Sequence, residues 1–314
     1  MVQNTTGIKH MDKPLIIVKV IGGLGNQMFQ YAAGRALASR IGGVLKLDLT
    51  DFATYEYHQY SLNKLAVEEI LASEEEIKYF TKYTIILKSL PKLLRLPITR
   101  LGLDKRLFAH AGYVQEKQST FEPEVFSLQK SAYLEGYWQS EKYFSDIRNV
   151  LLKEFDLKTP FGAAGQTFAD AINSTVTPIC IHIRRGDFAN NPTISKFHGT
   201  CSLEYYHNAV TLLSKSVQDP SFFVFSDDIK WAKQNFTLDA PVKYVGQGAD
   251  KNHEDIALMR LCKHFVLSNS TFGWWAAWLS NSPDKIVVAP DRWARMPLNV
   301  SDLLPPSWVQ LPTL

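Results

Sequence analysis

The sequence has few cysteines, no long hydrophobic run and little net charge, and each shortage excludes a class of protein. The three cysteines, Cys180, Cys201 and Cys262, are odd in number and widely spaced, so they predict neither a disulfide framework nor a zinc site. We interpret them as reduced thiols of a cytoplasmic protein. No window contains the roughly 18 apolar residues of a membrane-spanning helix, and we expect no signal peptide.

The net charge of +3 over 314 residues is too small to predict binding to nucleic acid, although it is compatible with a small anionic ligand. The most apolar stretch, Ile85 to Leu103, is interrupted by lysines, arginines and prolines. Two interpretations stay open for it: an ordinary helix pair packed on the core, and an amphipathic element that touches a membrane peripherally. The sequence does not indicate an oligomeric state.

The length of the chain favours two domains, because a domain usually contains roughly 100 to 200 residues. A charged stretch, Lys153 to Pro160, is followed by a stretch rich in glycine and alanine. Such a change in composition is typical of a domain boundary. We therefore expect one domain over residues 1–157 and a second over residues 158–314.

The first domain begins with the pattern strand, glycine turn, helix, strand. Gly23 and Gly25 match a dinucleotide-binding fingerprint and Asp48 lies at about the ribose-binding distance, but Met28 stands where the third glycine belongs. A glycine turn before a helix favours an anionic ligand. A tight turn without a ligand, and a nicotinamide-dependent oxidoreductase built on this unit, stay open as alternatives. The expected elements are a strand at 15–21, a helix at 28–40 and a strand at 44–48.

The second domain alternates short apolar runs with helical patterns, which predicts a parallel, doubly wound sheet. The fold class is therefore α/β. The expected strands are 178–184, 222–226, 242–246, 264–268 and 285–289, and the expected helices are 202–217, 229–236, 254–262 and 271–280.

Polar side chains follow three of these strands, and the carboxyl ends of parallel strands meet at the edge where ligands bind. Arginine forks such as those of Arg184 and Arg185 match a diphosphate or a carboxylate, and a helix that begins after Ser270 suits a phosphate. Asp227 or Asp228 can accept hydrogen bonds from a guanine edge or from ribose hydroxyls. The residues concerned are His182, Arg184, Arg185 and Asp187 after the first strand, Asp227 and Asp228 after the second, and Ser270 and Thr271 after the fourth.

Each of these residues also has a structural interpretation. Arg184 and Arg185 can belong to an arginine network with Asp187 as the partner, and Ser270 and Asp228 can be plain helix N-caps. Taken together on one rim, the residues favour a ligand over these alternatives.

Four motifs together resemble the bacterial α-1,2-fucosyltransferases closely, over about residues 17–290. They are GGLGNQMFQY at 22–31, HIRRGD at 182–187, FVFSDD at 223–228 and SNSTFGWWAAWL at 268–279. The resemblance implies a GT-B-type architecture in which two Rossmann-like domains face a donor/acceptor cleft. The first domain would be mainly the acceptor side, with a glycine-rich loop near the donor, and the second would bind GDP-fucose.

The resemblance also implies the reaction. GDP-fucose is the expected donor, and the acceptor is the 2-hydroxyl of a β-galactoside such as lactose or a glycan end. Transfer inverts the fucose anomeric carbon and needs neither a cofactor nor a metal ion. The expected location is the cytoplasm, with or without peripheral contact to the inner membrane. A non-catalytic sugar-binding protein is a further alternative.

The same resemblance assigns roles to single residues. Arg184 is expected to bind the donor diphosphate and to be catalytic, and Asp187 is the nearest carboxylate for a general base, ahead of Glu204. Gly273 stands where relatives often have serine, which is expected to cost only a secondary hydrogen bond. The remaining expected donor-binding residues are Gly25, Asn26, Gln27, His182, Arg185, Asp227, Asp228, Ser270, Thr271 and Phe272.

Overall fold

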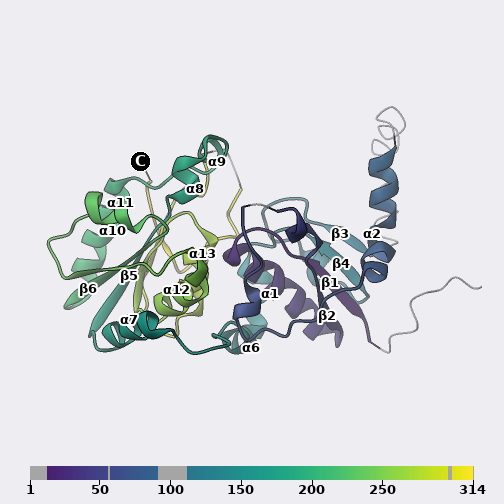
Figure 1. The fold of residues 1–314 in the computed structure, drawn as a ribbon, viewed down its shortest axis with the longest axis horizontal. Helices are drawn as coiled ribbons and strands as arrows, with labels where there is room; N and C mark the ends of the chain where they lie inside the picture. The colour runs from purple at the N-terminus through teal and green to yellow at the C-terminus, as the bar shows by residue number, and fades with distance from the viewer. Residues whose placement is uncertain (1–12, 56, 91–111, 296–298, 314) are drawn as a thin grey trace, which may run out of the picture. The chain divides into compact units, whose positions relative to one another are not determined.

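The computed structural model describes residues 13–55, 57–90, 112–295 and 299–313, and it divides into two compact units (Figure 1). Unit 1 comprises the chain up to Tyr60 together with Val67–Leu151, and unit 2 comprises Ser61–Ala66 and Leu152–Leu314. The chain thus enters unit 2 after Leu151, where the sequence placed the boundary after residue 157. The short segment Ser61–Ala66 also joins unit 2, because Leu65 bridges to Leu157 and the N–H of Ala66 donates to the Asp156 carbonyl.

Unit 1 contains a four-stranded parallel sheet in the order β2-β1-β4-β3. Helix α1 lies against one face of it, and the contact is so close that a Cβ atom at Gly34 would lie 2.2 Å from the Val18 side chain. Leu15 and Ile17 lie on the sheet face opposite that of Val18, because side chains alternate along a strand. Phe80 of helix α2 packs on them there. The elements are β1 Leu15–Lys19, α1 Leu24–Ile41, β2 Val44–Asp48, α2 Glu74–Ser89, β3 Tyr113–Gln115 and β4 Ala132–Glu135.

Helix α1 begins at Leu24 and not at Met28 as the sequence predicted. Gly23 is the N-cap, and the N–H groups of Asn26 and Gln27 both donate to its carbonyl, at 2.9 and 3.1 Å. Residues 24–27 of the expected glycine turn, 22–27, therefore form the first turn of the helix. The smaller elements are η1 Thr50–Ala53, α5 Pro123–Phe126, η3 Glu141–Tyr143, η4 Ser145–Ile147 and α6 Arg148–Glu154, the last of which runs across the boundary into unit 2.

The stretch Ile85 to Leu103, for which membrane contact was one interpretation, mostly lies outside the described residues. Helix α2 covers its beginning and ends at Ser89. In the described part of the chain, no helix has both the length and the hydropathy needed to cross a bilayer.

Unit 2 contains a six-stranded parallel sheet in the order β10-β9-β8-β5-β6-β7, which confirms the predicted doubly wound sheet and adds β10 at its edge. The strands are β5 Thr177–Ile183, β6 Pro220–Ser226, β7 Val242–Val245, β8 His264–Val266, β9 Val287–Pro290 and β10 Val309–Leu311. The order turns at β5, because β6 and β7 follow on one side and β8 on the other. Ligands bind at the carboxyl ends of strands beside such a switch point.

The helices of unit 2 connect these strands (Figure 1). They are α7 Ala163–Asn173, α8 Gly186–Asn190, α9 Pro192–Phe197, α10 Leu203–Ser216, α11 Ile229–Asn235, α12 Asn252–Met259 and α13 Thr271–Leu279, with 3₁₀ turns η2 Leu62–Lys64 and η5 Ala249–Lys251.

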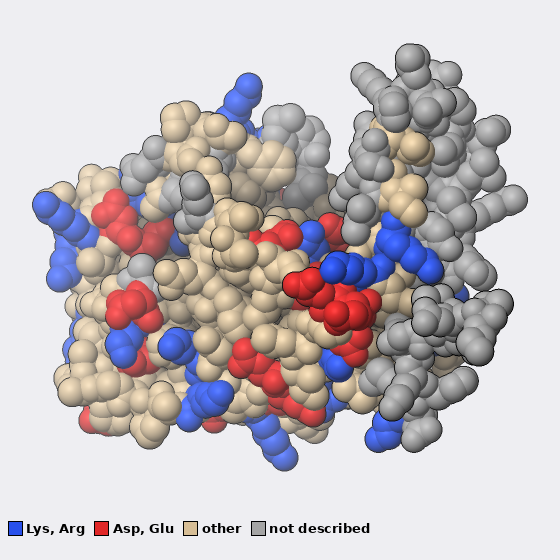
Figure 2. All heavy atoms as spheres, turned by 45° about the vertical axis from the view of Figure 1, so that its right-hand side comes forward, with Lys and Arg blue, Asp and Glu red and all other residues tan. Residues whose placement is uncertain are grey.

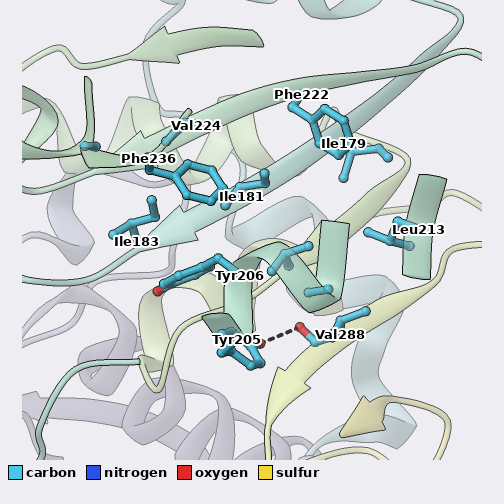
Figure 3. Packing of buried hydrophobic residues seen from close by; sticks show 13 residues of the cluster. Ile179, Ile181, Ile183, Tyr205, Tyr206, Leu213, Phe222, Val224, Phe236 and Val288 are labelled. Carbon is cyan, nitrogen blue, oxygen red and sulfur yellow. Dashed lines mark hydrogen bonds between the residues drawn. The ribbon is translucent and has the colours of Figure 1, made fainter. Parts of the chain in front are cut away.

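Period-two alternation along β5 decides which side chains enter the core. Ile179, Ile181 and Ile183 lie on one face and pack with Tyr205 and Tyr206 of α10 (Figure 3). The hydroxyl of Tyr205 donates to the carbonyls of Leu267 and Val288, at 2.6 and 3.3 Å. Burying each isoleucine contributes roughly 1.5–3 kcal/mol, and a slip of one residue would turn all three to the opposite face of the sheet, away from α10. His182 is therefore fixed on the opposite face.

The tryptophans of α13 pack in the interior, as the sequence predicted. Trp274 and Trp275 are fully buried with ring centroids 5.0 Å apart, and Trp275 also meets Phe155 edge to face. The indole N–H of Trp274 donates to the Leu303 carbonyl at 2.8 Å. This packing holds α13 in place, so its first turn has a defined position at the end of β8.

Candidate active site

Asp227 connects the two arginines that follow β5. Its Oδ2 lies 2.9 Å from Nη1 of Arg184, and its Oδ1 accepts the backbone N–H of Arg185 at 2.8 Å. A Cβ atom at position 186 would lie 2.5 Å from Oδ2 of Asp227, so Gly186 gives this carboxylate the space it occupies. The expected arginine network is present, but Asp227 is the partner shown. Asp187 lies in α8, and its side chain is outside the described part of the chain.

Arg184 and Arg185 have different surroundings. The Arg184–Asp227 pair is about one quarter exposed, with side-chain accessibilities of 23% and 24%. The guanidinium carbon of Arg185 lies 3.6 Å from the centroid of the Trp231 ring, a cation–π stack, and its Nε is buried with no hydrogen-bond partner in the described residues. The sequence reasoning missed Trp231. The sequence feature that could have identified it is an aromatic residue in the first turn of the helix after β6, three residues beyond the N-cap Asp228.

His182 is buried on the face of β5 opposite the isoleucines. Its Nδ1 lies 2.9 Å from the Ser268 hydroxyl, and its ring is tilted against that of Phe272 at 5.6 Å. Burial, together with the nearby positive charge of Arg184, lowers the pKa of His182 to about 3. The imidazole is therefore neutral at physiological pH, so it can exchange hydrogen bonds with a ligand but adds no charge.

Gly273 leaves room for the imidazole of His182. Its effect is therefore larger than the loss of a secondary hydrogen bond that the sequence predicted. A Cβ atom at position 273 would lie 2.7 Å from Nδ1 of His182 and 3.3 Å from the Leu267 side chain. Both neighbours are buried, so neither can move away cheaply. A serine at this position requires a different placement of the imidazole.

Asp228 and Ser270 are helix N-caps, as their structural interpretation had it. Oδ1 of Asp228 accepts the N–H of Trp231 at 3.1 Å, and the Ser270 hydroxyl accepts the N–H of Phe272 at 3.3 Å. A cap on α13 does not exclude a phosphate, because the helix dipole favours negative charge at the same end. Thr271 and Phe272 form the first turn of α13 at that end.

Two carboxylates at the start of α12 were not predicted. Oδ1 of Asp255 accepts a hydrogen bond from Gln247 at 3.2 Å, and the buried Glu254 accepts from the Gly162 N–H and from Lys251, at 3.2 and 2.9 Å. Burial, together with the negative charge of Glu254, raises the pKa of Asp255 to about 7. The carboxyl group of Asp255 thus changes charge near neutral pH. Burial of this kind leaves no signal in the local sequence.

Gly25, Asn26 and Gln27 lie in unit 1, in the first turn of α1, whereas all the other predicted site residues belong to unit 2. Nε2 of Gln139 donates to Oδ1 of Asn26 at 3.0 Å. The side chain of Gln27 is buried, and its Nε2 donates to the carbonyls of Gly22 and Gln59, at 2.7 and 2.9 Å. Gln27 therefore supports the turn.

Asp48 stands at the sequence position where a dinucleotide-binding fold has the carboxylate that binds the ribose. In this structure, however, its carboxylate already accepts hydrogen bonds within unit 1. Its Oδ2 accepts the Tyr133 hydroxyl at 2.6 Å, and its Oδ1 accepts both the N–H and the hydroxyl of Thr50, at 2.9 and 2.7 Å. The Asp48 side chain is 2% exposed. This geometry argues against a nicotinamide-binding unit.

One face of the molecule is mixed in charge. On the face drawn in Figure 2, blue and red side chains lie interspersed among uncharged ones across the described residues. Among the described residues, no group of three or more histidine, cysteine, aspartate or glutamate side chains could hold a metal ion.

Known proteins resemble this chain, one of them over nearly its whole length and another over about half of it. The family described as Glycosyl transferase family 11 matches residues 15–311. An α-1,2-colitosyltransferase of Escherichia coli is 32% identical over 306 residues, which cover 95% of this chain and 99% of the relative. The galactoside 2-α-L-fucosyltransferase Sec1 of Mus musculus is 30% identical over 161 residues, which cover 49% of this chain and 43% of the relative.

A solved structure shares the fold at low identity. Arabidopsis thaliana FUT1 in complex with GDP aligns with a TM-score of 0.52 and 12% identity, covering 91% of this chain and 72% of that one. With the two parallel sheets and their helices, this similarity confirms the expected α/β class of the GT-B type.

Proposed function

This chain belongs to glycosyl transferase family 11, and from that premise we propose that it transfers L-fucose from GDP-fucose to a terminal β-galactoside. The 2-hydroxyl of the galactose attacks the fucose anomeric carbon, the bond from that carbon to the β-phosphate oxygen breaks, and GDP leaves with the electron pair. The product is an α-1,2 linkage formed with inversion. The observation that carries the proposal is the arginine pair at the switch point of unit 2, held by Asp227.

The leaving group is where charge develops, and Arg184 suits its stabilisation. A guanidinium has five N–H donors in a planar fork, so Arg184 can keep Asp227 and still bind a phosphate. The N-terminus of α13 adds a second positive end at the neighbouring strand β8. Loss of one such donor typically costs about 100- to 1000-fold in rate.

We propose that the nucleoside of the donor binds beside His182. The neutral imidazole offers hydrogen bonds without repelling or attracting the diphosphate. Asp227 and Asp228 were the predicted partners of the base or ribose. Asp227 already pairs with Arg184, and Asp228 already caps α11. Each can therefore accept a hydrogen bond from the base or the ribose only with the carboxylate lone pairs that these interactions leave available.

The acceptor hydroxyl loses a proton during transfer, and Asp187 is the proposed base, with Glu204 as the second candidate. Replacing Asp187 with asparagine tests this, because a general base controls the acid limb of the pH dependence of kcat. An acid limb that is the same in the variant and the wild type contradicts the assignment. We propose that no metal ion takes part, so that activity persists in excess chelator.

A second candidate is transfer of colitose, which the name of the Escherichia coli relative favours. Colitose is fucose without the 3-hydroxyl, so the two reactions share the nucleotide, the linkage and the leaving group. The donor sugar, and not the chemistry, separates the candidates.

The experiment compares the two donors with lactose as acceptor. The purified full chain is incubated with GDP-fucose or GDP-colitose, GDP release is measured, and the linkage of the product is determined. Fucosyl transfer predicts the higher kcat/KM with GDP-fucose, and a higher value with GDP-colitose favours the second candidate. A protein that binds lactose without releasing GDP from either donor is a sugar-binding protein. Thermal stabilisation by NADH but not by GDP supports an oxidoreductase.

A further inference from the structure

The carboxyl edge of the unit 1 sheet gathers loops from three adjacent strands. Lys19 ends the central strand β1, and its ammonium lies 3.0 Å from Asp51 in the loop after β2 and 3.2 Å from Glu135 at the end of β4. All three side chains are partly exposed. Neighbouring strands lie about 4.8 Å apart, so the ends of β2 and β4, which flank β1, are roughly 10 Å apart. This is a span suited to two linked sugar rings.

The loop after β4 is held in a strained conformation. Trp138 has a φ of 56°, although it is a bulky residue and fully buried. Such a backbone costs on the order of 1–3 kcal/mol, and it persists only where the surroundings enforce it. Glu116 does so here, because its two oxygens accept the N–H groups of Tyr137 and Trp138, at 2.7 and 2.9 Å. A Cβ atom at Gly136 would lie 2.4 Å from Cβ of Glu116, so only glycine allows this approach.

This strained backbone keeps the side chain of Tyr137 at the surface. Tyr137 is 46% exposed, although it lies between the end of β4 and the buried Trp138. The same loop carries Gln139, which orients Asn26 of the glycine turn. Backbone strain of this kind is concentrated at functional sites, and here it holds an aromatic ring in solvent.

The loop after β2 displays a second ring. Phe52 and Tyr55 pack edge to face at 6.2 Å, and Tyr55 supports Tyr57 at 5.9 Å. Tyr57 itself is 66% exposed. The donation from Gln27 to the Gln59 carbonyl fastens this loop onto α1. Exposed tyrosines held by packed neighbours present their apolar faces at little cost in conformational entropy.

We propose that this edge, defined by Tyr57, Tyr137, Asp51 and Glu135, binds the galactose-terminated acceptor. Sugar rings present C–H faces that stack on tyrosine and hydroxyls that donate to carboxylates. The edge holds two carboxylates against one ammonium, so its net negative charge disfavours a phosphate and favours a neutral glycan. This inference rests on the proposed transfer to a galactoside and adds the surface that recognises it.

The test replaces each exposed ring separately and measures KM for lactose and for GDP-fucose. Tyr57→Ala and Tyr137→Ala are expected to raise KM for lactose about tenfold, the effect of losing roughly 1.4 kcal/mol of binding, with KM for GDP-fucose within twofold of wild type. Tyr57→Phe keeps the stacking face, so its KM for lactose should rise clearly less than that of Tyr57→Ala. Tyr79→Ala is the matched control, because Tyr79 is 49% exposed in the same unit but lies on α2.

The outcomes separate this inference from the function it rests on. Wild-type protein that does not release GDP with lactose refutes the proposed function and this inference with it. Active wild type with both alanine variants unchanged in KM for lactose refutes the acceptor surface alone. A similar rise in KM for GDP-fucose also refutes it, because the rings would then serve the donor. Both rings are exposed, so truncation leaves the core intact, and a thermal melt of each variant verifies this.

Discussion

Replacing Asp227 with alanine removes two interactions at once, and their sizes follow from the structure. The ion pair with Arg184 is about one quarter exposed, so its loss costs only about 0.2–1 kcal/mol of stability. The hydrogen bond from the Arg185 N–H goes to a charged acceptor, and its loss costs about 1.5–3 kcal/mol. We expect unit 2 to lose about 2–4 kcal/mol in all, which leaves a folded protein of reduced stability.

The effect on turnover is expected to be larger than the effect on folding. Without Asp227, Arg184 is no longer held in one conformation at the developing charge of the leaving group. We expect kcat to fall about 100-fold, the lower end of what the loss of a stabilising donor costs. Asp227→Asn is the matched variant, since its amide oxygen still accepts from Arg185 while the charge is lost. It should keep most of the stability and a larger share of kcat.

Three measurements test this reasoning: kcat with GDP-fucose and lactose, the dissociation constant for GDP, and the midpoint of thermal unfolding. The opposite hypothesis is that Asp227 competes with the diphosphate for Arg184. In that case Asp227→Asn binds GDP more tightly than wild type and kcat stays within threefold of it. Such a result refutes the positioning role of Asp227.

Three further predictions concern other residues of unit 2. Trp231→Ala removes the stack under Arg185 and should weaken GDP binding about fivefold, whereas Trp231→Phe, which keeps an aromatic face, should lose less; equal affinities contradict a role for the stack. Gly273→Ser forces a Cβ atom against His182 and should destabilise the protein by about 1–3 kcal/mol in a denaturant titration, and an unchanged midpoint refutes the close packing. The raised pKa of Asp255 means that the folded state favours the protonated carboxyl, so stability is fully present below the unfolded pKa near 4 and declines as pH rises towards about 7. Asp255→Asn should therefore unfold at a higher temperature than wild type at pH 8 but not at pH 4, and the same difference at both pH values contradicts this.

Local patterns predicted much of the fold. Alternating apolar runs and helical segments predicted the parallel sheet of unit 2, because side-chain periodicity is a property of each segment alone. The edge strand β10 was missed, since it has only three residues, two of them exposed and the third partly buried, and so carries no strong apolar signal. The start of α1 was placed four residues late, because glycines normally argue against a helix.

The predicted site residues of unit 2 lie at the carboxyl ends of its strands, as expected from the sequence, but only some of their contacts could be predicted. The sequence alone indicated that polar residues at the ends of β5, β6 and β8 share one edge, since this follows from parallel strand direction. It also indicated correctly that Asp228 and Ser270 can cap helices, a property of their short side chains. The partner of Arg184 was not predictable, because Asp187 and Asp227 were equally charged candidates.

The sequence by itself determined the α/β class, the strand ends that carry the arginines, and the family of the protein, because each depends on the order of residues within short segments. Tertiary structure alone decided that Asp227 holds Arg184, that Trp231 stacks on Arg185, and that His182 is neutral. These outcomes depend on distances between side chains from different strands and on the water that packing removes, and neither quantity is encoded in any one segment.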